Sequence, residues 1–116
     1  MWWRIGGALG ALGVILGAFG AHGLESRVAD PAQLEWWETG ARYHLVHAVA
    51  LLAVAAHPAR PKLAGWLFVV GIAVFSGTLY VMGLTGIRAL GAITPIGGLC
   101  FIGGWIALAA ARTGDA

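Results

Sequence analysis

Long stretches without a charged side chain alternate with short polar segments along the sequence. Three of these stretches, residues 5–21, 63–87 and 89–111, reach or nearly reach the ~20 residues that cross a hydrocarbon core of ~30 Å. A fourth apolar run, 43–56, is too short by itself but lengthens when it is read from Trp36. The pattern predicts an all-α integral membrane four-helix bundle, in which residues 1–116 form a single membrane domain. The predicted spans cover about residues 3–22, 34–57, 63–84 and 94–112.

Composition favours lipid over water as the surroundings of this chain. Of its 116 residues, 59% are hydrophobic and 10% are charged, whereas soluble domains carry roughly a quarter charged residues. The mean hydropathy is +0.83, and a chain this short could not bury so much apolar surface by folding alone. The formal net charge of +2 comes from scattered basic residues that form no stripe, which argues against nucleic-acid binding.

The start of the second helix has a clear local signal. Asp30 is expected as the N-cap and Pro31 as the first helical residue, and Gln33 completes a sequence typical of a capping box. The helix then enters the membrane near the aromatic pair Trp36 and Trp37. The first span is interpreted as retained, because its apolar stretch exceeds the about 7–15 residues of a signal peptide.

The start of the fourth span allows two interpretations because Pro95 lies inside the apolar stretch. Either the helix begins at 89–91 and kinks at the proline, or Thr94 is the N-cap and Pro95 the first helical residue. The second interpretation is favoured. It leaves Gly91, Ala92 and Ile93 as non-helical backbone that protein must cover.

The distribution of basic residues predicts the orientation. With four spans both termini lie on one side, and the basic residues of that side are Arg4, Arg60, Lys62 and Arg112. Arg27 and Arg88 fall on the other side. Because short cytoplasmic loops are enriched in Lys and Arg, we expect both termini in the cytoplasm and the loops 22–35 and 85–93 outside.

The 19 glycines predict close helix packing. In the first span they follow spacings of four and three, at Gly6, Gly10, Gly13, Gly17 and Gly20. Such a stripe forms a groove that another helix backbone can approach. The same glycine-lined faces would suit a structural or assembly subunit of a membrane complex, or a homo-oligomer.

Polar side chains in the second helix are the first candidates for function, because each is costly in hydrocarbon. Glu38 and Arg42 stand four residues apart in the order that favours a helical ion pair. Alternatively, Arg42 faces the bundle and clamps a phosphate or carboxylate, which suit its planar guanidinium. His47 lies deepest, and either bonds a hydroxyl or carbonyl or handles a proton or ligand.

The topology brings polar residues of all four helices to the outer leaflet. We therefore predict an outward-facing polar pocket that binds a lipid headgroup or a small polar ligand, with membrane lipids as partners. The alternative is a set of unrelated interfacial side chains. The candidate ligand-binding residues are His22, Glu38, Arg42, Tyr43, His47, Ser76, Tyr80 and Thr94.

The sequence offers little support for an enzyme. Ser26 and Ser76 have no base beside them, and Cys100 is the single cysteine. His44 and His47 have metal-ligand spacing but lack a third ligand. We therefore expect no catalytic residue, metal or cofactor. The remaining alternative is a redox component or an ion- or proton-transport component that uses His22 and His47. As a pair of haem ligands these two histidines are unfavourable, because they are expected to differ in membrane depth by several helical turns.

Four ordered motifs together cover nearly the whole chain. They are Gly17-Ala18-Phe19-Gly20-Ala21-His22-Gly23-Leu24, Thr39-Gly40-Ala41-Arg42-Tyr43-His44-Leu45-Val46-His47-Ala48, Ser76-Gly77-Thr78-Leu79-Tyr80, and Ile93-Thr94-Pro95-Ile96-Gly97-Gly98 with Gly104-Trp105. The chain resembles a small four-span membrane family of unknown function, which includes YgdD-like bacterial inner-membrane proteins and mitochondrial relatives in animals. The resemblance implies a bacterial inner-membrane location and implies no reaction. The positions that match its motifs are His22, Arg42, His47, Ser76, Tyr80, Thr94 and Pro95.

Overall fold

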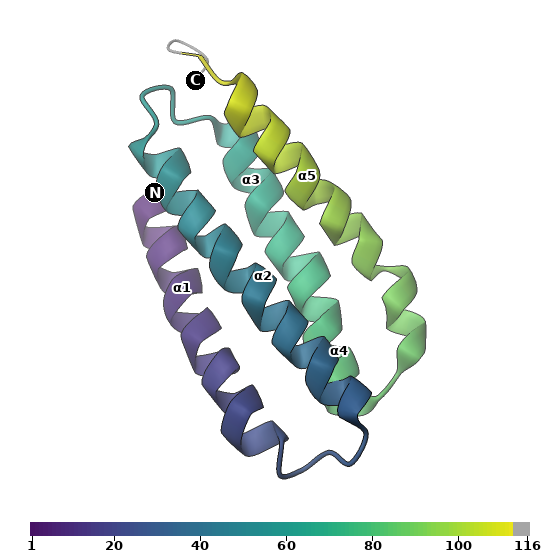
Figure 1. Cartoon of the computed structure of the whole chain (residues 1–116). Coiled ribbons are helices and arrows are strands. Elements are labelled where there is room, and N and C mark those ends of the chain that lie inside the picture. The colour runs from purple at the N-terminus through teal and green to yellow at the C-terminus, as the bar shows by residue number, and fades with distance from the viewer. Residues whose placement is uncertain (113–116) are drawn as a thin grey trace.

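Four long antiparallel helices lie side by side in a computed structural model, which describes residues 1–112 (Figure 1). The first consists of α1 (Trp2–Phe19) and a π-helical turn, η1 (Gly20–Leu24), and the second is α2 (Pro31–Ala56). The third consists of α3 (Lys62–Gly71), a π-helical segment, η2 (Ile72–Ser76), and α4 (Gly77–Thr85). The fourth follows a 3₁₀ turn, η3 (Arg88–Ala92), and is α5 (Thr94–Ala110). The predicted all-α class is confirmed.

The helices form a flat row more than a closed bundle. The Cα atoms extend over 51 × 26 × 16 Å, so one dimension is thin. Along the row, α1 packs on α2, α2 packs on η2 and α4, and α3 with η2 packs on α5. The edges of the row are α1 and α5, and the N-terminus and the last turn of α5 lie at the same end (Figure 1). We call this the terminal end, and the end that holds residues 25–30 and 86–87 the distal end.

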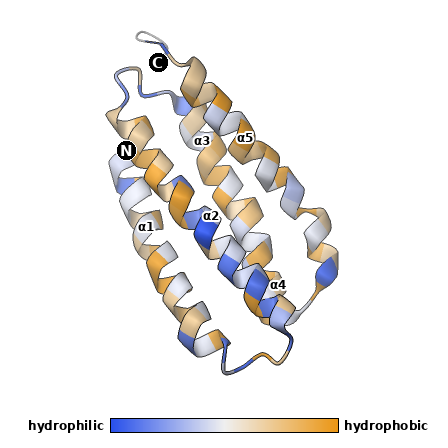
Figure 2. Cartoon of the chain, in the orientation of Figure 1, coloured by the Kyte–Doolittle hydropathy of each residue, from blue (hydrophilic) through white to orange (hydrophobic). Residues whose placement is uncertain are grey.

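Three of the long helices are apolar enough to cross a membrane. They are Trp2–Leu24, Lys62–Thr85 and Arg88–Ala110. The fourth, α2, is less apolar, and Figure 2 shows hydrophilic residues along its distal half while its neighbours are largely hydrophobic. It is nevertheless deeply packed, with ten buried residues between Trp37 and Ala55. The polar helix therefore lies inside the row between two apolar ones.

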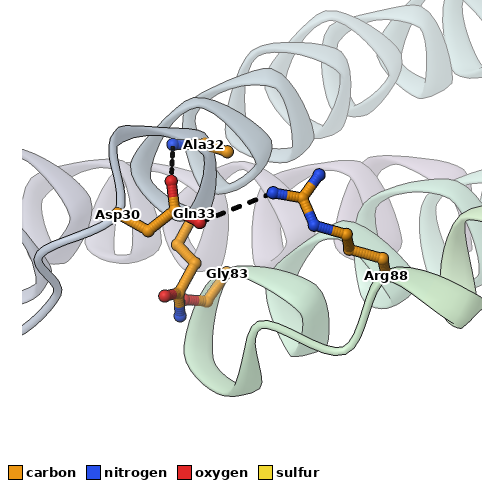
Figure 3. A network of polar contacts seen from close by, with 5 residues as sticks. All are labelled: Asp30, Ala32, Gln33, Gly83 and Arg88. Carbon is orange, nitrogen blue, oxygen red and sulfur yellow. Dashed lines mark hydrogen bonds and ion pairs between the residues drawn. The ribbon is translucent and has the colours of Figure 1, made fainter.

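The start of α2 is fixed by the predicted cap and by one contact that the sequence did not suggest (Figure 3). The Asp30 carboxylate accepts a hydrogen bond from the backbone nitrogen of Ala32 at 3.0 Å, so the N-cap prediction is confirmed. Gln33, however, does not close a capping box. Its amide nitrogen donates to the Gly83 carbonyl at 2.9 Å and ties α2 to α4 instead. Arg88 adds an exposed ion pair to Asp30 at 3.6 Å.

The start of α5 agrees with the favoured interpretation except at its cap. Pro95 lies in the first helical turn, where its missing N–H leaves no helical bond unmade. The N-cap is Ile93, and Thr94 is the first helical residue, so the predicted Thr94 cap is wrong. Residues 91 and 92 are not irregular either, because they belong to the 3₁₀ turn η3.

Close backbone approach requires a glycine at position 97, and Gly13 packs tightly against a side chain. A Cβ atom on Gly97 of α5 would collide with the backbone of Phe75 in η2, and a Cβ on Gly13 of α1 would lie 2.8 Å from the Leu45 side chain of α2. The predicted stripe of α1 is used in part: Gly6, Gly13 and Gly20 are buried, whereas a Cβ added at Gly17 would meet no atom within 4 Å. Every second glycine of the stripe therefore packs on α2.

Candidate functional site

Polar side chains join α2 to its neighbours by bonding backbone carbonyls. The Trp37 indole nitrogen donates to Leu16 of α1 at 2.7 Å. The Ser76 hydroxyl of η2 donates to Gly40 of α2 at 2.7 Å, and Ser76 is completely buried. Lipid chains cannot form hydrogen bonds with these polar groups, so the groups bond each other instead. Such interhelical hydrogen bonds stabilise the packing of membrane helices.

His44 links three helices and is 1% exposed. Its Nε2 lies 2.8 Å from the Leu9 carbonyl oxygen of α1, and its Nδ1 lies 2.8 Å from the Tyr80 hydroxyl of α4. Because a carbonyl oxygen only accepts, Nε2 carries the proton and donates. In its neutral form His44 then accepts a hydrogen bond from the Tyr80 hydroxyl at Nδ1. The pair leaves neither imidazole nitrogen free for a ligand.

His47, 3% exposed, has the opposite tautomer. The indole nitrogen of Trp105 can only donate, and it lies 3.0 Å from His47 Nε2, so that nitrogen is the acceptor. Nδ1 then carries the proton and donates to the Tyr43 carbonyl at 2.6 Å. The ring also stacks on Phe101, with centroids 3.6 Å apart. If His47 were protonated at both nitrogens, its Nε2–H would face the indole N–H of Trp105, and two donors cannot form a hydrogen bond.

Thr94 takes part in a further polar contact, between α4 and α5. Its hydroxyl oxygen lies 2.6 Å from that of Thr78. Thr78 also reaches the carbonyls of Val74 and Phe75, in the π-helical segment where regular α-helical bonding is interrupted. The two threonines therefore satisfy irregular backbone at the position where α5 approaches most closely.

These contacts account for the buried polar groups. Among the residues that the structure describes, every buried side-chain nitrogen or oxygen has a hydrogen-bond partner. Ser76, Tyr80, Thr94 and His47 thus hold helices together. No group of three or more His, Cys, Asp or Glu side chains within residues 1–112 could hold a metal ion.

The other predicted residues lie on the surface of the row. His22, Glu38, Arg42 and Tyr43 are exposed. Glu38 and Arg42 do not form the expected ion pair within the described part of the chain, where the ion pair that does form joins Asp30 and Arg88. An exposed pair gains only about 0–1 kcal/mol, which is too little to fix two flexible side chains. The eight predicted residues are therefore divided between interhelical contacts and an outer face.

A groove of about 640 Å³ opens between α2 and α5, and we call it the α2–α5 groove. Phe75 of η2 also contributes to its wall. Most of its lining is aromatic or aliphatic. The lining residues are Tyr43, Val46, His47, Phe75, Pro95, Gly98, Leu99, Phe101, Ile102 and Trp105. Two of the predicted residues, Tyr43 and His47, belong to it.

The hydroxyl of Tyr43 is the polar group that the α2–α5 groove leaves available. Tyr43 is 41% exposed, and its hydroxyl bonds none of the residues in the described range 1–112. Its ring packs against Phe75 with centroids 4.8 Å apart. Both nitrogens of His47 have partners, so the groove offers a binding molecule one hydroxyl and a largely apolar wall.

A smaller groove of about 260 Å³ lies between α1 and the segment formed by η2 and α4. Leu12, Leu16 and Ile72 are typical of its aliphatic lining, and His44 and Tyr80 contribute to it with their polar atoms already bonded to each other. It therefore presents apolar surface and no free polar group of that pair.

Sequence reasoning missed several residues that build the site. Trp37, His44, Phe101 and Trp105 are absent from the predicted set. A signal for α2 was present: positions 37, 41, 44, 48, 51 and 55 alternate spacings of four and three, the period of a buried helix face. His44 lies within that series between Ala41 and Ala48, and both of these are buried.

Comparisons with known proteins give one consistent result. A family model described as "Protein of unknown function (DUF423)" matches residues 16–98. The UPF0382 membrane protein YwdK of Bacillus subtilis is 47% identical over 112 residues, which cover 90% of each chain. A UPF0382 membrane protein of Schizosaccharomyces pombe is 41% identical over 110 residues, covering 89% of this chain and 93% of the relative. One of Haemophilus influenzae is 43% identical over 102 residues, covering 83% and 80%.

These relatives come from bacteria and a fungus, and each is named a membrane protein. The expectation of a small membrane family of unknown function is confirmed. No solved structure matches the chain.

Proposed function

Since this chain belongs to the UPF0382 family of membrane proteins of unknown function, we propose that it is a non-catalytic, multi-pass membrane protein that holds a bilayer lipid in the α2–α5 groove. The groove itself is the observation that carries this proposal. It is large and mostly apolar, and it opens on the surface of the helix row where lipid chains would surround the protein. If the groove were empty, the side chains that line it would lack van der Waals contacts on that side.

All four helices cross the membrane in this proposal, α2 included. Helix α2 packs on α1 along one side and on η2 and α4 along the other, and both of those helices are apolar enough to span. Its buried side chains Trp37 and His44 are turned to α1 and bonded there, and Ser76 of η2 bonds the α2 backbone at Gly40. An amphipathic helix enclosed in this way can cross with its partners.

The orientation follows from the charges at the two ends. Arg4, Arg60 and Lys62 lie at the terminal end, against Arg27 and Arg88 at the distal end. The positive-inside tendency then directs the terminal end, with both termini, to the cytoplasm of a bacterial cell. The distal end faces the outer leaflet of the inner membrane. So does the end of the α2–α5 groove that Tyr43 and Pro95 line, which we call its mouth.

A non-catalytic role is consistent with the way the buried polar groups are used. A catalytic residue must reach the reacting atoms of its substrate. His47, Ser76 and Tyr80 instead bond another helix or the backbone of their own helix. Exchange of these partners for a substrate would loosen the row.

Lipid retention after purification tests the proposal. Gly98 lines the groove, so Gly98→Leu would place a side chain inside it. Gly7 is exposed on α1 with open space around it, and Gly7→Leu is the matched control. The protein is purified in mild detergent, washed, and its bound phospholipid measured by native mass spectrometry. We expect retained lipid in the wild type and Gly7→Leu, and its loss in Gly98→Leu with unchanged thermal unfolding. Equal lipid in both variants would refute groove binding.

A second candidate function is assembly with other membrane helices. Gly7 and Gly17 on α1 and Gly77 on α4 have no atom within 4 Å of an added Cβ position, so their surfaces are open to close helix contact. Cysteine cross-linking from Gly7→Cys in intact membranes tests this candidate. A cross-linked product is the expected result, and monomer alone under oxidising conditions would count against it.

A further inference from the structure

Charged residues follow a fixed order along the exposed side of α2. Glu35, Glu38 and Arg42 are all exposed. By the helical rise, Glu38 stands about 6 Å and Glu35 about 10 Å nearer the distal end than Arg42. None of the three takes part in the ion pair that residues 1–112 contain, which joins Asp30 and Arg88. The stripe thus presents two carboxylates toward the outside and a guanidinium below them.

This stripe adjoins the mouth of the α2–α5 groove. Arg42 precedes Tyr43 in the chain and lies one helical turn from Val46, and both of these residues line the groove. Side chains on a helix tilt toward its N-terminus, which for α2 is the distal end. Arg42 therefore extends from the mouth of the groove toward Glu38, in the direction in which a lipid headgroup would lie above its chains.

We propose that the lipid in the groove is a zwitterionic phospholipid with a primary ammonium group, of the phosphatidylethanolamine type. This inference rests on the proposed function and names the class of lipid. The phosphate of such a lipid lies next to its glycerol, and the ammonium group lies further out. From the glycerol outward, such a lipid carries first a negative and then a positive charge. This order complements α2, where Arg42 is followed toward the distal end by Glu38.

The hydrogen-bonding groups also match this headgroup. A guanidinium bonds phosphate oxygens in a two-pronged arrangement, and a primary ammonium offers three N–H donors to a carboxylate. The Tyr43 hydroxyl at the mouth of the groove can donate to an ester carbonyl of the same lipid. A choline headgroup has no N–H donor, and a glycerol headgroup brings no positive charge to Glu38.

Competition among lipids provides the test. Wild-type protein is equilibrated with an equimolar mixture of phosphatidylethanolamine, phosphatidylcholine and phosphatidylglycerol, and the bound species are counted by native mass spectrometry. We expect phosphatidylethanolamine to exceed each of the others by a factor of up to about five, which corresponds to the ~1 kcal/mol upper limit for an exposed charge pair. Equal amounts of the three lipids, or a preference for phosphatidylglycerol, would overturn the inference.

Charge variants separate this headgroup recognition from groove binding. Glu38→Lys should shift the preference toward phosphatidylglycerol. Arg42→Gln removes the partner of the phosphate that all three lipids carry, so it should lower the bound amount of each. Glu25→Lys, an exposed change in the distal loop, is the matched control and should leave the preference unchanged. An unaltered preference in Glu38→Lys, or unaltered amounts of bound lipid in Arg42→Gln, would overturn the inference while lipid in the groove remains. Absence of bound lipid in the wild type would instead refute the proposed function itself.

Discussion

The indole nitrogen of Trp105 lies 3.0 Å from Nε2 of His47, and this bond joins the edge helix α5 directly to α2. The main packing of α5 is on α3 and η2. The bond adds a direct link between α5 and α2, and both residues line the groove between these helices. Because Nε2 must accept this bond, His47 is neutral and its nitrogens are not available to a haem or metal.

Removal of this bond should weaken the fold by a modest amount. Trp105→Phe keeps an aromatic ring against Phe68 but leaves His47 Nε2 without its donor. We expect the free energy of unfolding to fall by about 1 kcal/mol, the size of an interhelical hydrogen bond in a membrane protein. Unfolding with sodium dodecyl sulfate, followed by circular dichroism, measures it. An unchanged free energy of unfolding would show that the Trp105–His47 bond does not stabilise the fold.

The two tyrosines of the chain provide a matched pair of tests. Tyr80→Phe removes the hydroxyl that donates to buried His44, and should lower the free energy of unfolding by about 1–3 kcal/mol, the cost of an unsatisfied buried acceptor. Tyr43→Phe removes a hydroxyl with no partner among residues 1–112 and should leave stability unchanged. The same detergent unfolding experiment compares them. Equal effects of the two substitutions would contradict the assignment.

Adjacent glycines in α5 should differ in their tolerance of a methyl group. Gly97→Ala drives a Cβ against the backbone of Phe75, so we expect a loss of about 1–3 kcal/mol from overpacking. Gly98→Ala places its Cβ 3.8 Å from the Phe75 ring, an ordinary contact, and should be nearly neutral. Thermal unfolding in detergent ranks the two variants. A stable Gly97→Ala protein would show that η2 and α5 do not approach so closely.

The orientation can be tested with single cysteines. Cys100→Ala removes the native thiol, after which Arg60→Cys labels the terminal end and Ser26→Cys the distal end. In intact cells a membrane-impermeant maleimide should label the cysteine at position 26 and leave position 60 unlabelled until the cells are opened. The reverse pattern would place the termini outside, and labelling of both positions in intact cells would exclude the four-span topology.

The sequence predicted the elements that depend on local chemistry. Helix class, the Asp30 cap and the place of Pro95 follow from hydropathy and from backbone rules that act within one turn. Gln33 shows the limit of such rules. Its local signal indicated a capping box, but the Gly83 carbonyl of another helix was within reach and took the bond.

The candidate site was harder to predict because its contacts join residues from different helices. His44 bonds Leu9 and Tyr80, which lie 35 and 36 residues away in the chain. The spacing of the buried positions along α2 places His44 on the inner face and leaves Arg42 off it, but it does not show which residues of α1 and α4 lie opposite His44. The flat row also depends on which pairs of helices pack, and that choice follows from the fit of particular glycines against Trp37 and Phe75.

A structure of the protein determined in a lipid mesophase that contains phosphatidylethanolamine tests the central claim most directly. We expect an ordered phospholipid with a chain between Val46 and Leu99, and its phosphate within hydrogen-bonding distance of the Arg42 guanidinium. A groove closed by direct packing of α5 on α2, or filled by a helix of another chain, would contradict the account.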